Sequence, residues 1–299
     1  MDTVEEFIIR TYCLVDDEMK AVLGSTKLRQ RGVAPRLSDA EVLTMEVVGE
    51  ILGNTNDTEI WAYFRRHWLA LFPGLGSRTT FTRQAANLWV LKQMLHARLL
   101  ARLHLERFRL FLVDGFPIPV CAFCRAPQAK CFRGEACIGY CASKKQRYYG
   151  FKGELVVSGS GVIVGWTAGP ANADERAMLW EVTEGIRGLL LGDKGYIDGS
   201  LTQQLAAERG VWLEPVGLRS NMKETRPASR LRELVAAREL VETVIGQLTE
   251  RFKIGHIRAR DLWHLTSKLS RKILAHTVAV LFCREADDTS LRFARLIAA

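Results

Sequence analysis

The first third of the chain has apolar residues at helical spacing. In LSDAEVLTMEVVGEIL, Ser38 and Glu41 form a capping-box pattern ahead of such a run. The later segments TEIWAYFRRHWLALF and RTTFTRQAANLWVLKQMLHARLLARLHLE continue the pattern, the second as one long helix or two, and the turn PGLGS separates them. This pattern predicts a helical part over residues 1–105.

From about residue 107 the pattern becomes that of strands. RFRLFLVDGFPIPVC has an apolar run from Leu110 to Val113, and Pro117 and Pro119 stop any helix. GFKGELVVSGSGVIVGWTAG predicts two strands joined by a Ser-Gly-Ser-Gly turn, and VWLEPV predicts another. GLLLGD predicts a buried strand that ends immediately before Asp193.

Helical patterns alternate with these strands and close the chain. They are NADERAMLWEVTEGI, SLTQQLAAERG and the stretch from SRLRELVAARELVETVIGQLTERF to the end. Strands followed by strand–helix alternation and closing helices indicate an α/β core with mixed strand pairing. We therefore expect a helical domain over 1–105 and an α/β domain with C-terminal helices over 106–299.

Charge adds information about the partner. The chain has 42 Lys+Arg against 33 Asp+Glu, a net charge of +9 and an isoelectric point near 9.3, which favours a polyanion such as nucleic acid. The basic residues cluster, as expected of a protein that holds a phosphate backbone, in RQRGVAPR, FRRHW, KQMLHARLLARLHLERFR, SKKQRYYGFK and RFKIGHIRARD. No apolar run is long enough for a membrane helix, and the acidic N-terminus argues against a signal peptide. The expected location is the cytoplasm, in association with the nucleoid.

Five of the seven cysteines lie between Cys121 and Cys141. Four thiolates can surround a zinc ion, and CAFC supplies one Cys-x-x-Cys pair. The remaining spacings are irregular, and free cysteines are common small buried residues. Zinc is therefore the weaker of the two interpretations.

Two acids follow strands in the same way. FLVD ends on Asp114 and LLLGD ends on Asp193, and acids at strand ends of an open α/β sheet line the crevice where ligands bind. Glu242, among apolar residues of a predicted helix, would reach the same edge if that helix packs on the sheet. Each acid alone is equally explained by a turn cap or a surface salt bridge, as Asp174 is by a helix N-cap.

Three carboxylates brought together repel one another unless a cation compensates them. Mg²⁺ prefers oxygen ligands and takes few carboxylates, which leaves positions for water and phosphate oxygens. Two such ions about 4 Å apart can clamp the attacking and leaving oxygens of a phosphoryl displacement. This chemistry would explain why a buried strand ends on Asp193.

The motifs VDGFPIPVC, YYGFKGELVVSGSGVIVGWTAGPANADER, LLGDKGYID and RELVETVIGQLTERF together resemble the DDE transposases of bacterial insertion sequences. The resemblance extends from about residue 35 to residue 282 and is closest to the insertion-sequence 982 family. It implies an RNase H-like catalytic core that binds Mg²⁺ or Mn²⁺ through Asp114, Asp193 and Glu242. Such enzymes cut at the terminal inverted repeats and join the freed 3′-hydroxyl to target DNA, so double-stranded DNA and a homodimer on DNA are the expected partners. Residues 1–105 would then be a DNA-binding domain that helps bind the inverted repeats, and residues 106–299 the catalytic domain.

The sequence departs from related insertion-sequence-4 enzymes around the glutamate. Their Tyr-x2-Arg-x3-Glu-x6-Lys pattern is kept here only as Arg238 and Glu242, because Val235 and Thr249 occupy the tyrosine and lysine positions. Arg251 is a candidate for the missing positive charge. The nearest rival of Glu242 is Glu239, three residues earlier and on a similar helix face.

The residues expected to contact DNA share a positive charge or a position beside the predicted acids: Lys144, Lys145, Arg147, Lys152, Lys194, Tyr196, Arg238, Arg251, Arg258 and Arg260. Each could instead belong to a solvated face or a packed turn. A transposase-derived DNA-binding protein without catalysis is the alternative function, and a nuclease that cuts without joining is a third.

Overall fold

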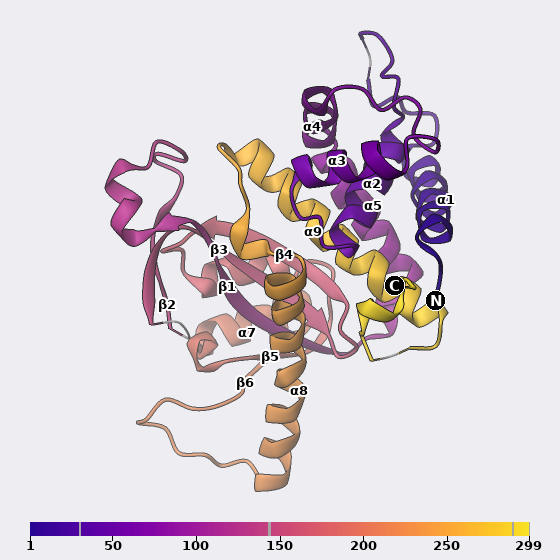
Figure 1. Cartoon of the computed structure of the whole chain (residues 1–299). Coiled ribbons are helices and arrows are strands. Elements are labelled where there is room, and N and C mark those ends of the chain that lie inside the picture. Colours follow the sequence, from indigo (N-terminus) through magenta and orange to yellow (C-terminus); the bar gives the residue numbers. More distant parts are fainter. Residues whose placement is uncertain (30, 143–144, 289, 299) are drawn as a thin grey trace. The chain divides into compact units, whose positions relative to one another are not determined.

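The computed structural model describes residues 1–29, 31–142, 145–288 and 290–298. The chain divides into two compact units (Figure 1). The helical unit comprises residues 1–103 and 251–299, and the sheet unit comprises residues 104–250. Residues 251–299 thus group with the first helices by contact, whereas the sequence analysis placed them with the α/β part. The functional domain boundaries stay a prediction.

In the helical unit, two helices are buried along almost their whole length. The helices are α1 (Val4–Leu23), α2 (Asp39–Ile51), α3 (Asp57–His67), α4 (Arg78–Asn87), α5 (Trp89–Arg102) and α9 (Leu262–Glu285). Helix α2 is buried along its whole length and α9 from Ser267 to Cys283 almost without interruption, because α1, α3, α4 and α5 pack around them. The predicted capping box of Ser38 and Glu41 is confirmed at the start of α2.

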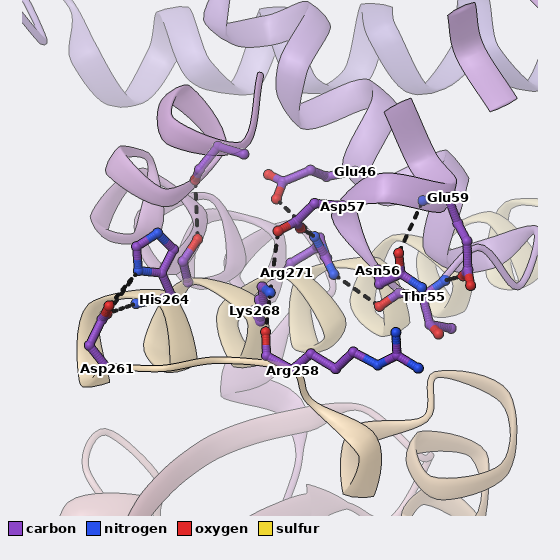
Figure 2. Close-up of polar contacts among 12 residues, drawn as sticks. Glu46, Thr55, Asn56, Asp57, Glu59, Arg258, Asp261, His264, Lys268 and Arg271 are labelled. Atoms are coloured by element: carbon purple, nitrogen blue, oxygen red, sulfur yellow. Dashed lines mark hydrogen bonds and ion pairs between the residues drawn. The ribbon is translucent and has the colours of Figure 1, made fainter. Parts of the chain in front are cut away.

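Charged side chains join these helices inside the unit. Arg271 of α9 donates to Glu50 at 2.7 Å and to Asp57 at 2.6 Å, and its guanidinium also reaches Glu46 at 3.4 Å. Lys268 forms an ion pair with Asp57 at 3.2 Å (Figure 2). Because Glu46, Glu50 and Arg271 are at most 1 % exposed, their charges must be compensated by one another.

The sheet unit contains one mixed sheet with helices. Its elements are β1 (Leu110–Ala122), β2 (Cys137–Cys141), β3 (Gln146–Ser158), β4 (Ile163–Pro170), α6 (Glu175–Val182), β5 (Gly188–Gly192), α7 (Gly199–Arg209), β6 (Val211–Pro215) and α8 (Ala228–Gly246). The strand order is β2-β3-β1-β5-β6, and β4 also pairs with β3. Strands β1, β5 and β6 are parallel, and β3 is antiparallel to its neighbours. The predicted α/β class with mixed pairing is confirmed.

Strand β1 is longer than the sequence pattern indicates. It continues through Pro117 and Pro119 to Ala122, with a register shift between Pro119 and Cys121. Its pairing with β5 is confined to Leu110–Leu112, so the prolines lie where β1 has β3 as its partner on one side. Proline is tolerated there because its missing N–H interrupts no second ladder.

The helical stretch predicted from Ser229 to the end of the chain contains two long helices. Helix α8 ends at Gly246, a π-helical turn follows over Gln247–Arg251, and α9 begins at Leu262. Helix α8 packs on β1, β3 and β5 and so covers one face of the sheet. Within the described part of the chain, no helix has the length and apolar character needed to cross a membrane.

Candidate catalytic site

Asp114 lies at the point where β1 leaves its parallel neighbour. The pairing of β1 with β5 ends at Leu112, and Asp114 follows two residues later on the same face of the strand. Its carboxylate accepts a hydrogen bond from the Gly115 amide at 2.8 Å and forms an ion pair with Arg238 at 3.0 Å. Burial raises the pKa of Asp114 to about 6, with Arg238 acting in the opposite direction. Such a carboxyl favours a nearby cation.

Arg238 connects two of the predicted catalytic acids. Its guanidinium lies 3.0 Å from Oδ2 of Asp114 and 3.2 Å from Oε1 of Glu242, one turn further along α8. Glu242 thus shares a cation with Asp114 of β1, whereas no ion pair of Glu239 is present among the described residues. The choice of Glu242 over Glu239 as the third acid stays a prediction.

Asp193 follows β5 directly, as the sequence indicates. Its side chain caps the 3-10 turn Lys194–Tyr196 by accepting a hydrogen bond from the Gly195 amide at 2.7 Å. The negative charge of Asp193 contributes to the raised pKa of Asp114, so the two carboxyl groups lie within electrostatic reach. The turn-cap interpretation of Asp193 is confirmed, and a cation at the same carboxylate stays a prediction.

Tyr196 anchors this turn from inside the unit. The ring is 1 % exposed, and the hydroxyl donates to Oε1 of Glu154 at 3.1 Å. At Gly192 a Cβ atom would come within 2.7 Å of the ring, so only glycine leaves room for it. This burial differs from the expected contact of Tyr196 with phosphate, because its hydroxyl is directed to β3 and away from solvent.

Glu154 is an acid that the sequence analysis missed. It lies on β3 opposite Gly115, is fully buried, and has Oε2 without a hydrogen-bond partner. Burial raises the pKa of Glu154 to about 8, so the carboxyl is mostly protonated at neutral pH. In the sequence, Glu154 is marked by its position as a single acid within the apolar run GELVVS, and a charge beside an apolar run is also what marks Asp193.

Glu175, the first residue of α6, was also missed. A Cβ atom at Gly115 would lie 3.3 Å from its Oε1, and one at Gly195 would lie 3.4 Å from its Oε2, so its carboxylate lies beside β1 and beside the turn that follows Asp193. Lys152 pairs with it at 3.1 Å. Lys152 is therefore engaged by an acid of the sheet unit and is only partly available for the DNA contact that was predicted.

The donor chemistry of this site fits a hard divalent cation. The side chains that meet here are carboxylates, which Mg²⁺ and Mn²⁺ accept as ligands. The positive charge between Asp114 and Glu242 is supplied by Arg238. Over the described ranges, no group of three or more His, Cys, Asp or Glu side chains is close enough to hold a metal ion.

The remaining predicted DNA contacts differ in their surroundings. In the sheet unit, Lys145, Arg147 and Lys194 are exposed, whereas Lys144 lies outside the described residues. In the helical unit, Arg258 and Arg260 are exposed. Arg251 belongs to the helical unit as well, where it donates to the carbonyl of Ile51 at 2.7 Å and burial lowers its pKa.

The cysteine-rich segment follows the end of β1. Cys121 lies one residue before the end of the β1–β3 pairing, Cys124 lies in the short helix Phe123–Gln128, and Cys137 and Cys141 bound β2. No three of the described cysteines come together as a metal site.

The sheet unit thus carries Asp114 on β1, Asp193 directly after β5 and Glu242 on α8. Residues 106–262 match the model of the family described as "Transposase DDE domain", which covers slightly more than half of the chain. The chain belongs to the DDE transposase family. No curated protein matches the sequence.

Membership of this family indicates transposition as the function and a polynucleotidyl transferase or nuclease as the kind of enzyme. It implies DNA as the partner, and DDE domains in general use divalent metal ions. The matched residues include Asp114, Asp193 and Glu242, and so contain every acid of the candidate site.

Proposed function

We propose that the protein is an insertion-sequence transposase that cuts at terminal inverted repeats and joins the 3′-hydroxyl ends to target DNA. The observation that carries this proposal is Arg238, which holds Asp114 and Glu242 together at the strand edge next to Asp193. An RNase H-like core, with the antiparallel strands β4, β3 and β1 followed by the parallel strands β5 and β6, is supported by the strand order. The resemblance to the insertion-sequence 982 family belongs to the same proposal.

In this proposal Asp114, Asp193 and Glu242 are the catalytic carboxylates and hold Mg²⁺ or Mn²⁺. A divalent ion bound to them would activate the attacking hydroxyl or water and stabilise the leaving oxygen. The raised pKa of Asp114 and its ion pair with Arg238 are consistent with a site built for positive charge.

The chain's own residues position the DNA. Lys194, exposed directly after Asp193, can hold a phosphate oxygen near the reacting bond, and Lys145 and Arg147 can hold the backbone further along. Tyr196 and Glu154 fix the turn that carries Asp193. Pairing of two transposon ends requires two copies of the chain, so we propose a homodimer on DNA.

The decisive experiment compares the native chain with Asp193→Asn in cleavage and strand transfer on labelled transposon-end DNA with Mg²⁺ or Mn²⁺. Asparagine keeps an acceptor for the Gly195 amide, so the substitution removes the charge without removing the cap. Asp198→Asn is the matched control, because Asp198 caps α7 five residues later and has no proposed catalytic role.

We expect Asp193→Asn to abolish both reactions while DNA binding persists, and Asp198→Asn to retain them. Activity that survives in Asp193→Asn would refute the assigned triad. Cleavage without joining in the native chain would favour a nuclease. Binding to transposon ends without any reaction in the native chain would favour a transposase-derived DNA-binding protein.

A further inference from the structure

The segment between Glu59 and Glu106 contains no Asp or Glu, although it spans α4, α5 and most of α3. It carries Arg65 and Arg66 near the end of α3 and Arg78 and Arg83 on α4, and these four side chains are exposed. A stretch without acids cannot neutralise its cations from within, so acids elsewhere in the chain or an anionic partner must compensate them.

These four arginines differ from other arginines of the helical unit. Arg10 and Arg102 each pair with Glu285, and Arg98 pairs with Glu18 at 2.9 Å. Over the part of the chain that the structure describes, no ion pair involves the four arginines of α3 and α4, and the guanidinium of Arg65 lies over the ring of Trp61.

The connection between α3 and α4 is held firmly. Trp61 donates from Nε1 to the carbonyl of Gly76 at 3.0 Å, and the rings of Phe64 and Phe72 pack edge to face at 5.0 Å. A Cβ atom at Gly74 would come within 2.5 Å of the carbonyl oxygen of Arg36. The exposed Arg36 therefore adjoins this connection.

The start of α3 is fixed as well. Arg271 donates to Asp57 and to the carbonyl of Thr55, and Asn56 and Glu59 cap the first turn (Figure 2). Helices α3 and α4 contact each other and lie side by side (Figure 1). Their exposed side chains thus have a rigid support, which lowers the entropic cost of ordering them on a partner.

Helix α4 has one buried face and one polar face. Phe81, Gln84, Ala85 and Ala86 are buried, and the helix packs against α2 and α9. Its exposed residues are the polar side chains Arg78, Thr79, Thr80, Arg83 and Asn87. A ten-residue helix is about 15 Å long, and a helix of this kind fits the major groove of DNA, which is about 12 Å wide.

We propose that this face of α4, together with Arg36, Arg65 and Arg66, is a surface that binds duplex DNA with α4 in the major groove. The proposal rests on the proposed function and specifies how the transposase recognises its DNA. Arg83 and Asn87 read base edges, because an arginine pairs with guanine and an asparagine with adenine through two hydrogen bonds. Arg36, Arg65, Arg66 and Arg78 contact phosphates and set the register.

The test uses the full chain without divalent metal, so that binding is measured apart from cleavage. A duplex is first selected from a randomised 30-base-pair library by the native chain, and a random-sequence duplex serves as the non-specific probe. Affinities of Arg83→Ala, Arg66→Ala and the control Arg98→Ala are measured for both duplexes over a range of salt concentrations. Circular dichroism checks that each variant is folded.

We expect Arg83→Ala to weaken binding to the selected duplex by about 5- to 150-fold and to alter the preferred base at one position. Arg66→Ala should weaken binding to both duplexes equally. It should also reduce the slope of affinity against salt concentration by about one released counterion. Arg98→Ala should bind as the native chain does, since Arg98 is already paired with Glu18.

Folded Arg83→Ala and Arg66→Ala variants that bind both duplexes like the native chain would overturn the proposal. So would an Arg98→Ala variant that loses more affinity than either of them. These results are independent of the catalytic test: if Asp193→Asn keeps cleavage activity while Arg83→Ala loses its preference, the triad fails and the α4 surface stands.

Discussion

Replacing Lys92 by methionine should destabilise the helical unit by about 3 kcal/mol at pH 7. Lys92 is fully buried, and its ammonium lies 2.7 Å from Glu46, 2.8 Å from the hydroxyl of Ser267 and 3.0 Å from the carbonyl of Ala85. Methionine fills a similar volume but supplies no charge. Glu46 then keeps only the longer 3.4 Å contact with Arg271.

The magnitude follows from the way in which Glu46 can respond. An unpaired buried carboxylate costs several kcal/mol, but the group can avoid that cost by taking up a proton. Protonation at pH 7 of a carboxyl with an ordinary pKa of 4.5 costs about 3.4 kcal/mol, which sets an upper limit. At pH 5 the same limit is about 0.7 kcal/mol, so the defect of Lys92→Met should shrink as the pH falls.

Urea unfolding followed by tryptophan fluorescence at pH 7 and pH 5 measures this difference. The double variant Glu46→Leu/Lys92→Met is the matched control, because it removes both charges and leaves Arg271 paired with Glu50 and Asp57. Its stability should return to within about 1 kcal/mol of the native chain. Two results would refute this prediction. One is a loss of unfolding free energy below about 1 kcal/mol in Lys92→Met at pH 7, and the other is a double variant no more stable than Lys92→Met.

Three further predictions concern other parts of the chain. Tyr196→Phe should reduce strand cleavage more than DNA binding, because the turn at Asp193 loses the hydrogen bond to Glu154. Glu154→Gln should retain activity, because glutamine keeps an acceptor for the Tyr196 hydroxyl. Parallel cleavage and binding assays measure both effects. Burial lowers the pKa of His96 to about 4, so between pH 6.5 and pH 4 the unfolded state binds the extra proton. His96 should therefore contribute about 2.5 kcal/mol to the change in the free energy of unfolding between pH 7 and pH 4.5, measured as the difference between the native chain and His96→Gln. Arg238→Gln should lower the melting temperature in EDTA, with partial recovery in Mg²⁺, because a cation can replace the lost charge beside Asp114; an equal loss in both buffers would contradict a metal site there.

Much of the secondary structure follows from the sequence because its signals are local. Ser38 and Glu41 predict the start of α2, and the Ser-Gly-Ser-Gly turn predicts the connection of β3 and β4, since both depend on neighbouring residues alone. The position of Asp193 immediately after a buried strand is local as well. These features require no knowledge of what packs against them.

Other features depend on contacts between residues far apart in the chain. The extension of β1 through Pro117 and Pro119 depends on β3, which supplies the ladder on its one paired side. The position of the break between α8 and α9 and the grouping of α9 with α2 and α5 also depend on contacts with distant parts of the chain. Periodicity gives a helix its apolar face but does not identify the partner of that face.

The sequence by itself determined the composition of the candidate site: an acid at the end of each of two apolar runs, a glutamate on a helix, and an arginine four residues before it. Only the tertiary structure decided that this arginine bridges Asp114 and Glu242, and that Glu154 lies buried behind the site with Tyr196 as its donor. The physical reason is that burial, charge compensation and hydrogen bonding are properties of side chains brought together by folding, and residue spacing along the chain does not specify them.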